Sequence, residues 1–144
     1  MMELRLKRAR EIKRRRLIRR LFTGIVEETV GKELSARVEF SIRKNSKQST
    51  CRHYTSGRIK VILSLASREK KIKYGYTDFY YEGRAEKLNR YILNNRHDEL
   101  RFVLYHEARH AQQRLTGVRN EMSRRIAELD ADDWALKHLG VTIQ

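Results

Sequence analysis

The hydrophobic pattern of the chain changes period twice, and this change limits the folds that the chain can adopt. From residue 3 to residue 30 the apolar side chains recur at helical spacing, with no proline and a single glycine. From Leu34 to Arg43 apolar and polar residues alternate, as in a strand with one buried face. After Asp98 the spacing is helical again. This order predicts an α+β fold in which a long N-terminal helix precedes a small sheet and two further helices.

Other segments between the helices are expected to complete the sheet. Residues Ile59 to Leu65 form a β-branched run suited to a central strand, and the tyrosine-rich segment from Tyr74 to Tyr81 suggests an edge strand. The polar stretch from Lys44 to Gly57 is predicted to be a turn, whereas the segment from Ala85 to Asn95 fits a helix or a strand. We therefore expect a mixed or antiparallel sheet of three to four strands.

Two helices are expected in the C-terminal part of the chain. Asp98 can cap a helix that ends near Gly117, and a second helix is predicted from about Asn120 to Leu139, with Gly140 as its stop signal. The apolar residues that we expect on one buried face of the second helix are Met122, Ile126, Leu129 and Leu136.

Length and composition narrow the class of protein. A chain of 144 residues has room for one domain, so we expect residues 1–144 to form a single unit. The one cysteine, Cys51, allows no internal disulfide and is expected to be an unreactive small residue in a reducing compartment. No apolar run approaches the ~18 residues of a membrane span. The expectation is an intracellular, soluble protein that is cytoplasmic or associated with the nucleoid.

The net charge of +15 is concentrated in the first predicted helix, at about residues 3–30. Residues 1–20 hold ten basic and two acidic side chains, which leaves +7 for the rest of the chain. Such a helix can be a solvated face, can lie on an anionic membrane surface or act as a targeting segment, or can contact nucleic acid. For the last alternative the candidate contacts are Arg14, Arg15, Arg16, Arg19 and Arg20.

Residues 106–110 read His-Glu-Ala-Arg-His and are the main candidates for a metal-binding and catalytic site. In a helix His106 and His110 lie one turn apart, about 40° around the axis, so both imidazoles can reach one metal ion. Glu107 lies beside them, where its carboxylate can deprotonate a water molecule next to the metal. The spacing indicates a zinc site with the arrangement used by zinc peptidases.

A catalytic zinc ion has three protein ligands and one open position, so a third ligand must come from elsewhere in the chain. The second C-terminal helix offers Glu128, 18 residues after His110, which is enough for the chain to reverse direction. Asp132 follows one turn later on the same face, where its carboxylate can accept the second ring N–H of a ligating histidine. The alternative is that both acids pair with Arg124 or Arg125.

Together, residues 106–110 and 128–132 resemble the HExxH plus ExxxD signature of the gluzincins, the thermolysin-like clan of zinc metallopeptidases. Only 12 residues follow Asp132, so the resemblance is closest to the minigluzincins, single-domain forms with a small sheet, a backing helix, an active-site helix and a glutamate helix. The resemblance implies one zinc ion per chain, bound by His106, His110 and Glu128. It also implies that Glu107 is the general base and acid, and that Asp132 hydrogen-bonds to a ligating histidine.

Peptide hydrolysis also needs a group that stabilises the oxyanion of the tetrahedral intermediate. No spacing singles out one residue for this role. The candidates are His53, Tyr74, Tyr76, Tyr80, Tyr81, Tyr105 and His138. The sequence thus predicts a zinc-dependent endopeptidase acting on proteins or peptides. The alternative is a basic nucleic-acid-binding protein with a structural or degenerate zinc site.

Overall fold

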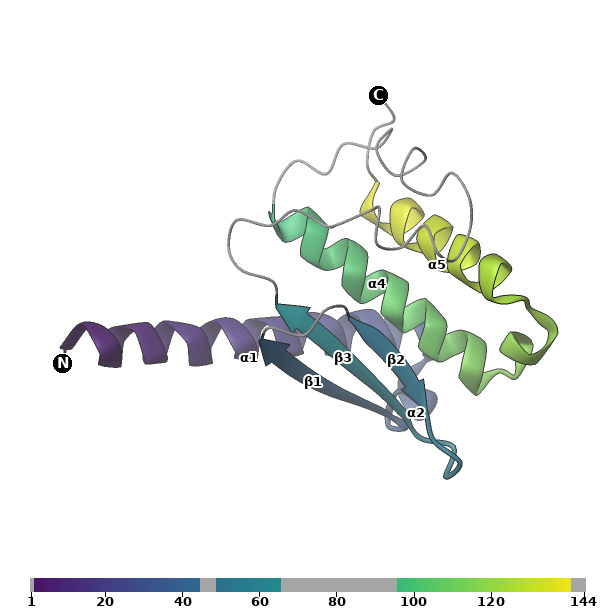
Figure 1. Cartoon of the computed structure of the whole chain (residues 1–144), viewed down its shortest axis with the longest axis horizontal. Helices are drawn as coiled ribbons and strands as arrows, with labels where there is room; N and C mark the ends of the chain where they lie inside the picture. Colours follow the sequence, from purple (N-terminus) through teal and green to yellow (C-terminus); the bar gives the residue numbers. More distant parts are fainter. Residues whose placement is uncertain (1, 45–48, 66–95, 141–144) are drawn as a thin grey trace.

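The computed structural model describes residues 2–44, 49–65 and 96–140 (Figure 1). The long first helix, α1, runs Met2–Val30 and is followed by the single turn α2, Lys32–Ser35. Gly31 separates the two with a φ of 86°, a backbone conformation that costs glycine little. The expected segments Tyr74–Tyr81 and Ala85–Asn95 lie outside the described residues.

Three described strands form a mixed sheet in the order β1-β3-β2. The central strand β3, Ile59–Leu65, pairs in parallel with β1, Val38–Lys44, and antiparallel with β2, Thr50–His53. Phe40 of β1 and Cys51 of β2 are both opposite Val61. The predicted central strand is confirmed, and its β-branched composition suits its buried position.

Two sequence predictions for the sheet are wrong in their bounds. The strand expected from Leu34 begins only at Val38, because Leu34 belongs to α2. The stretch expected to be a turn contains β2, since a short edge strand is held by backbone hydrogen bonds to its neighbour and needs no apolar alternation. Among the described residues of this stretch, a turn connects β2 to β3, where the Gly57 N–H donates to the carbonyl of Tyr54 at 2.9 Å and Gly57 has a φ of 85°.

The two C-terminal helices are α4, Arg96–Leu115, and α5, Arg124–Leu139, with the short 3₁₀ helix η2, Val118–Glu121, between them. The first begins earlier than expected, so Asp98 lies within its first turn rather than at its cap. Ser123 caps α5, with its hydroxyl accepting from the backbone N–H of Ile126 at 3.2 Å. Gly140 ends α5 in the left-handed conformation, as predicted.

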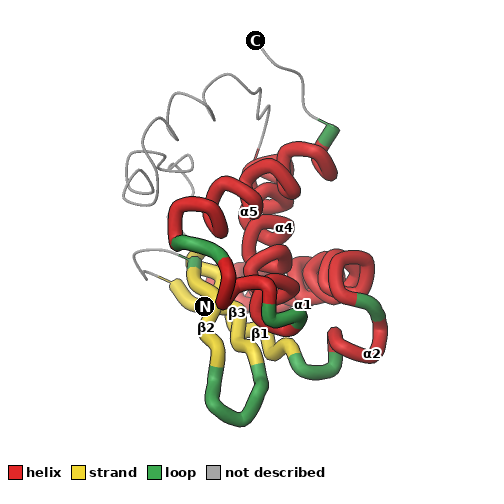
Figure 2. Tube along the Cα trace, turned by 90° about the vertical axis from the view of Figure 1, so that its right-hand side faces the viewer, coloured by secondary structure: helices red, strands yellow, loops and turns green. Residues whose placement is uncertain are grey.

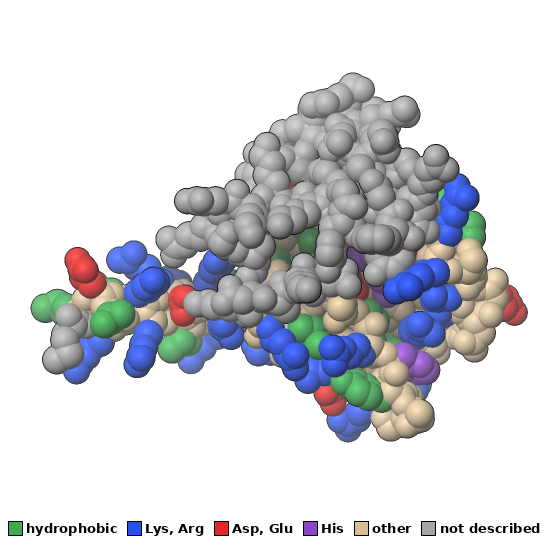
Figure 3. All heavy atoms as spheres, viewed as in Figure 1, with side chains coloured by type: hydrophobic (Ala, Val, Ile, Leu, Met, Phe, Trp, Pro, Cys, Tyr) green, Lys and Arg blue, Asp and Glu red, His purple; other side chains and the backbone are tan. Residues whose placement is uncertain are grey.

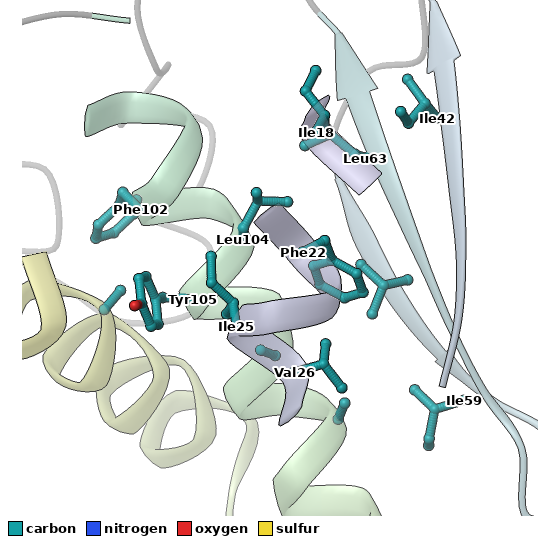
Figure 4. Close-up of a cluster of buried hydrophobic side chains, with 14 of the residues drawn as sticks. Ile18, Phe22, Ile25, Val26, Ile42, Ile59, Leu63, Phe102, Leu104 and Tyr105 are labelled. Carbon is teal, nitrogen blue, oxygen red and sulfur yellow. The ribbon is translucent and has the colours of Figure 1, made fainter. Parts of the chain in front are cut away.

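The hydrophobic core lies between one face of the sheet and the helices α1 and α4, and α5 packs along α4 (Figure 2). Alternate residues of β3, Ile59, Val61 and Leu63, point toward this core. The buried side chains of α1 and α4 meet them there (Figure 4). They are Ile18, Phe22, Ile25, Val26, Phe102, Leu104, Tyr105, Ala108 and Ala111. The predicted N-terminal helix is therefore present as α1, and it packs against the core from Ile18 onward.

The buried face of α5 differs from the predicted one. Ile126 is 48% exposed, whereas three alanines spaced four residues apart, Ala127, Ala131 and Ala135, are buried. Small side chains at this spacing let α5 approach α4 closely, and they leave room for larger neighbours on the same face. Glu128 and Asp132 are such neighbours, and both are buried. The buried face of α5 is therefore built from these alanines, the two acids and Leu136, the one residue of the predicted apolar set that is buried.

Candidate metal centre

The helix α4 positions both histidines of the His-Glu-Ala-Arg-His segment. His106 and His110 lie one helical turn apart, and their ring planes are nearly perpendicular with centroids 4.6 Å apart. Their Nε2 atoms approach each other to 3.0 Å. The side chains are only 8% and 14% exposed, respectively. The two nitrogen atoms therefore point to one place at the junction of α4 and α5.

Glu128 of α5 completes a group of three at this place. Its Oε2 lies 3.0 Å from Nε2 of His106, and its Oε1 lies 2.9 Å from Nε2 of His110. Three ligand atoms from His106, His110 and Glu128 all lie within 4.8 Å of one another. The structure thus brings together the three residues that the sequence suggested as a ligand set.

Asp132 lies behind His106, on the side opposite this convergence. Its Oδ1 is 2.8 Å from Nδ1 of His106, and its side chain is fully buried. Asp132 is one turn beyond Glu128 on α5, so one face of α5 supplies contacts to both ring nitrogens of His106. A carboxylate at Nδ1 favours a proton on that nitrogen, which leaves Nε2 as the ring atom available to a metal ion.

Gln113 orients the His110 ring through Nδ1, a role that was not predicted from the sequence. Its Oε1 lies 2.8 Å from Nδ1 of His110, and its Nε2 donates to the carbonyl of Ala127 at 3.0 Å and to Asp130 at 2.9 Å. Because the last two partners only accept, the amide nitrogen must lie on their side and the amide oxygen must face His110. The spacing of three residues from His110 is the signal that points to Gln113.

The Nε2 atoms of both imidazoles therefore face each other and the Glu128 carboxylate, so a proton on a ring nitrogen or a bound cation is needed among them. Atoms bound to a tetrahedral zinc ion at about 2.0–2.1 Å are about 3.3 Å apart. The distances of 2.9 to 3.0 Å between the facing atoms are within about 0.4 Å of that spacing. Two imidazoles and one carboxylate also match the donor set of catalytic zinc sites.

The electrostatics of the group favour a cation. Burial alone would lower the pKa of His106, but contacts with Asp132 and Glu128 outweigh burial and raise that pKa to about 10. Burial likewise opposes charge on Glu128, yet its contacts with His106 and His110 hold its pKa well below the ordinary value. The two carboxylates thus stabilise positive charge at the place where the imidazoles converge.

Glu107 is buried beside this group, on the side of α4 that faces the edge strand β2. Glu107 is close enough to Cys51 of β2 to affect its titration. Burial raises the pKa of the Cys51 thiol, and the negative charge of Glu107 raises that pKa further. The Cys51 thiol is therefore protonated at neutral pH, in line with the unreactive residue expected from the sequence. The carboxylate beside the first histidine thus lies close to an edge of the sheet.

Arg109, within the same segment, ties α4 to α5. Its Nε donates to Asp130 at 2.7 Å, a second nitrogen donates to the other oxygen of Asp130 at 3.2 Å, and its guanidinium lies 4.5 Å from the centroid of the Trp134 ring. The contact with Arg109, together with that of Gln113, lowers the pKa of Asp130 below its ordinary value against the opposing effect of burial. Asp130 therefore links the guanidinium of Arg109 to the amide that orients His110.

Of the candidates for stabilising an oxyanion, Tyr105 and His138 take part in a second cluster that joins α1, α4 and α5. The Tyr105 hydroxyl donates to Glu28 at 3.1 Å, and burial together with Glu28 raises the Tyr105 pKa. The His138 ring lies against Tyr105 and Trp134 and bonds to the Trp134 carbonyl. His53 is exposed on β2, and the four other tyrosines lie outside the described residues.

The candidate nucleic-acid contacts lie on α1, apart from the three-residue group. Arg14, Arg16 and Arg20 are exposed, and Arg15 is half-buried. Arg19 donates to the carbonyl of Phe40 at 3.0 Å and lies over its ring, which ties α1 to β1. Arg19 therefore has a structural partner in the folded chain.

Comparison with known protein families, curated proteins and solved structures finds no match for this chain. Among the helices of residues 2–44, 49–65 and 96–140, none is long and apolar enough to cross a membrane. The class of site is therefore defined by its geometry, which is that of two histidines and one glutamate on two packed helices that could hold a metal ion.

Proposed function

We propose that this chain is a zinc-dependent endopeptidase. The observation that carries the proposal is the convergence of Nε2 of His106, Nε2 of His110 and the Glu128 carboxylate, with Glu107 next to the first histidine. The resemblance of the two segments to the HExxH plus ExxxD signature of minigluzincins supports the same activity. Both lines of argument use the same residues, but one rests on atomic distances and the other on spacing in the sequence.

The roles of the side chains follow from their positions. His106, His110 and Glu128 would hold the zinc ion, and Asp132 and Gln113 would orient the two imidazoles. A bound zinc ion supplies a Lewis acid that lowers the pKa of water and polarises a carbonyl group. Three protein ligands leave one coordination position for these tasks.

Glu107 performs the proton transfers. Its carboxylate accepts a proton from the water whose oxygen attacks the carbon of the peptide bond. As the C–N bond breaks, Glu107 delivers that proton to the departing amine nitrogen, so the carboxylate returns to its starting state. The burial of Glu107 strengthens this role, because surrounding water is excluded from the proton transfer.

The experiment separates catalysis from metal binding. In zinc-loaded protein, Glu107→Gln should retain the metal while casein hydrolysis falls by at least about 100-fold. The matched control is Glu121→Gln on the exposed surface of η2, which should keep both the metal and the activity. Full activity in Glu107→Gln would contradict the proposal. So would zinc-loaded wild-type protein that cleaves neither casein nor a mixed peptide library, a result that favours a structural zinc site.

A further inference from the structure

The first half of α1 extends beyond the other described helices and strands. Residues 2–17, here named the basic arm, precede Ile18, the first residue of α1 that is buried in the core. Leu4 is 64% exposed, and Ile12 and Leu17 are each 54% exposed. In Figure 1 this part of the helix projects from the sheet and the other helices. Sixteen helical residues span about 24 Å, so the arm offers a long cylinder to a partner.

The charge of the basic arm is strongly positive. It holds eight basic and two acidic side chains. Glu3, Lys7, Glu11 and Arg15 follow one another at intervals of four residues, a spacing at which opposite charges support an isolated helix. Figure 3 shows Lys and Arg side chains along both visible edges of the projecting helix. Arg8 and Arg14 lie three residues from Glu11, and the basic side chains without an acidic residue three or four positions away are Arg5, Arg10, Lys13 and Arg16.

The arrangement around the helix distinguishes a nucleic acid from a membrane. A helix that binds a membrane surface needs its apolar residues on one face. At about 100° per residue, the exposed Met2, Leu6 and Leu17 lie within about 60° of one another, but Lys13 lies between them. Leu4 and Ile12 point about 80° to 160° away from Met2, so the apolar residues form no uninterrupted face. The basic residues also surround the axis, because Arg14 and Arg16 differ by about 160°. A cylinder that is basic all round suits a groove with phosphates on both walls.

The dimensions favour B-form DNA among nucleic acids. An α-helix with side chains is about 10–12 Å across, and the major groove of B-DNA is about 12 Å wide. The major groove of A-form RNA is too deep and narrow for side chains to read. The arm contains no asparagine or glutamine, the side chains that pair with adenine through two hydrogen bonds. Contacts to phosphates should therefore dominate over reading of the base sequence.

We infer that the basic arm binds double-stranded DNA by lying in its major groove and contacting the phosphates of both strands. The inference depends on α1 alone and is independent of any activity at the group of His106, His110 and Glu128. If both hold, the fold would place that group on a protein attached to DNA. From Ile18 onward, the second half of α1 is packed in the core. The basic arm continues the same helix, so its direction relative to the core follows from that packing.

The test measures the affinity of the full chain for a short DNA duplex by fluorescence anisotropy as salt rises. With about six phosphate contacts, the plot of log affinity against log salt should have a slope of about −5, a loss of roughly 1,000-fold between about 50 and 200 mM salt. Duplexes of unrelated sequence should bind within about threefold of one another. A double-stranded RNA of the same length should bind more weakly.

A matched pair of triple variants assigns the binding to the arm. Arg10→Gln, Arg14→Gln and Arg16→Gln together should reduce the slope by up to about three units, and glutamine preserves helix propensity. The control removes the same charge from exposed positions elsewhere, as Lys32→Gln, Arg125→Gln and Lys137→Gln, and should leave the slope nearly unchanged. Circular dichroism should show equal helix content in both variants.

Several results would overturn the inference. Absence of binding to the duplex at about 50 mM salt would remove DNA as a partner. Equal losses in the two triple variants would show only a diffuse charge effect. Tighter binding to vesicles with phosphatidylserine than to DNA would identify a membrane surface as the partner. Double-stranded RNA that binds as tightly as DNA would refute the groove assignment.

Discussion

The carboxylate of Asp132 on α5 lies 2.8 Å from Nδ1 of His106 on α4, and the Asp132 side chain has no exposed surface. A buried carboxylate in this position costs free energy unless a positive or proton-donating partner compensates it. His106 is that partner, and its other ring nitrogen faces Glu128 at 3.0 Å. The interface between α4 and α5 is therefore organised around an imidazole held between two acids, an arrangement that a proton on His106 or a bound cation stabilises.

The first prediction concerns the metal itself. The purified protein should bind about one zinc ion per chain, and His106→Ala, His110→Ala and Glu128→Ala should each abolish stoichiometric binding. Zinc content is measured by plasma mass spectrometry after dialysis. The control is His53→Ala, an exposed histidine on β2, which should keep full zinc content. Full zinc content in Glu128→Ala would remove that residue from the ligand set.

Removal of the metal should lower the stability of the fold, since zinc binds the folded chain and not an unfolded one. At a free zinc concentration about 1,000 times the dissociation constant, the stabilisation should be about 4 kcal/mol. Thermal unfolding with and without a chelator measures the effect, which should reverse when zinc is restored. A melting temperature independent of zinc would contradict a site that spans α4 and α5.

Asp132→Asn should weaken zinc binding by roughly 10- to 100-fold, because the amide keeps the shape but loses the charge that stabilises the His106 N–H donor. Competition with a chromophoric chelator measures the affinity. Asp133→Asn is the matched control, since Asp133 is its exposed neighbour on α5. An unchanged affinity in Asp132→Asn would mean that the carboxylate does not act on the metal through His106.

Gln113→Ala should also weaken zinc binding, by about 10-fold or more, because His110 loses the acceptor that holds the proton on Nδ1. Gln112→Ala provides the control within the same helical turn, since Gln112 donates to the carbonyl of Thr29 and stabilises the packing of α1 on α4. Unfolding of both variants should require less urea than wild type, but only Gln113→Ala should lose zinc affinity. If Gln113→Ala and Gln112→Ala bound zinc with the same affinity, Gln113 would contribute only to packing and not to the metal site.

Arg109→Ala should destabilise the metal-free protein by about 1–3 kcal/mol, because it removes hydrogen bonds to the carboxylate of Asp130 and a cation–π contact with Trp134. Arg109→Lys should recover only part of this loss, since an ammonium group cannot reproduce the two-point contact. Urea denaturation measures the difference. Arg58→Ala, which breaks an exposed ion pair with Glu39, should cost less than about 1 kcal/mol.

Local spacing was sufficient to predict the histidine pair and the helices that carry it. The turn of an α-helix places residues four apart on one side, so the positions of His106 and His110 follow from helix geometry alone. The same rule placed Glu128 and Asp132 together, and the structure adds that both contact His106. Glycines with unusual backbone freedom marked the helix ends for the same local reason.

Packing between distant segments determined what the spacing could not. Apolar character suggested that Ile126 is buried, but the alanines of α5 allow the closer approach to α4, and so they face it. The strand β2 exists because β3 offers it hydrogen bonds, and Gln113 orients His110 because the carbonyl of Ala127 and Asp130 fix its amide. Each of these depends on the free energy of contacts between segments far apart in the chain, whereas the period of a helix depends only on its own backbone.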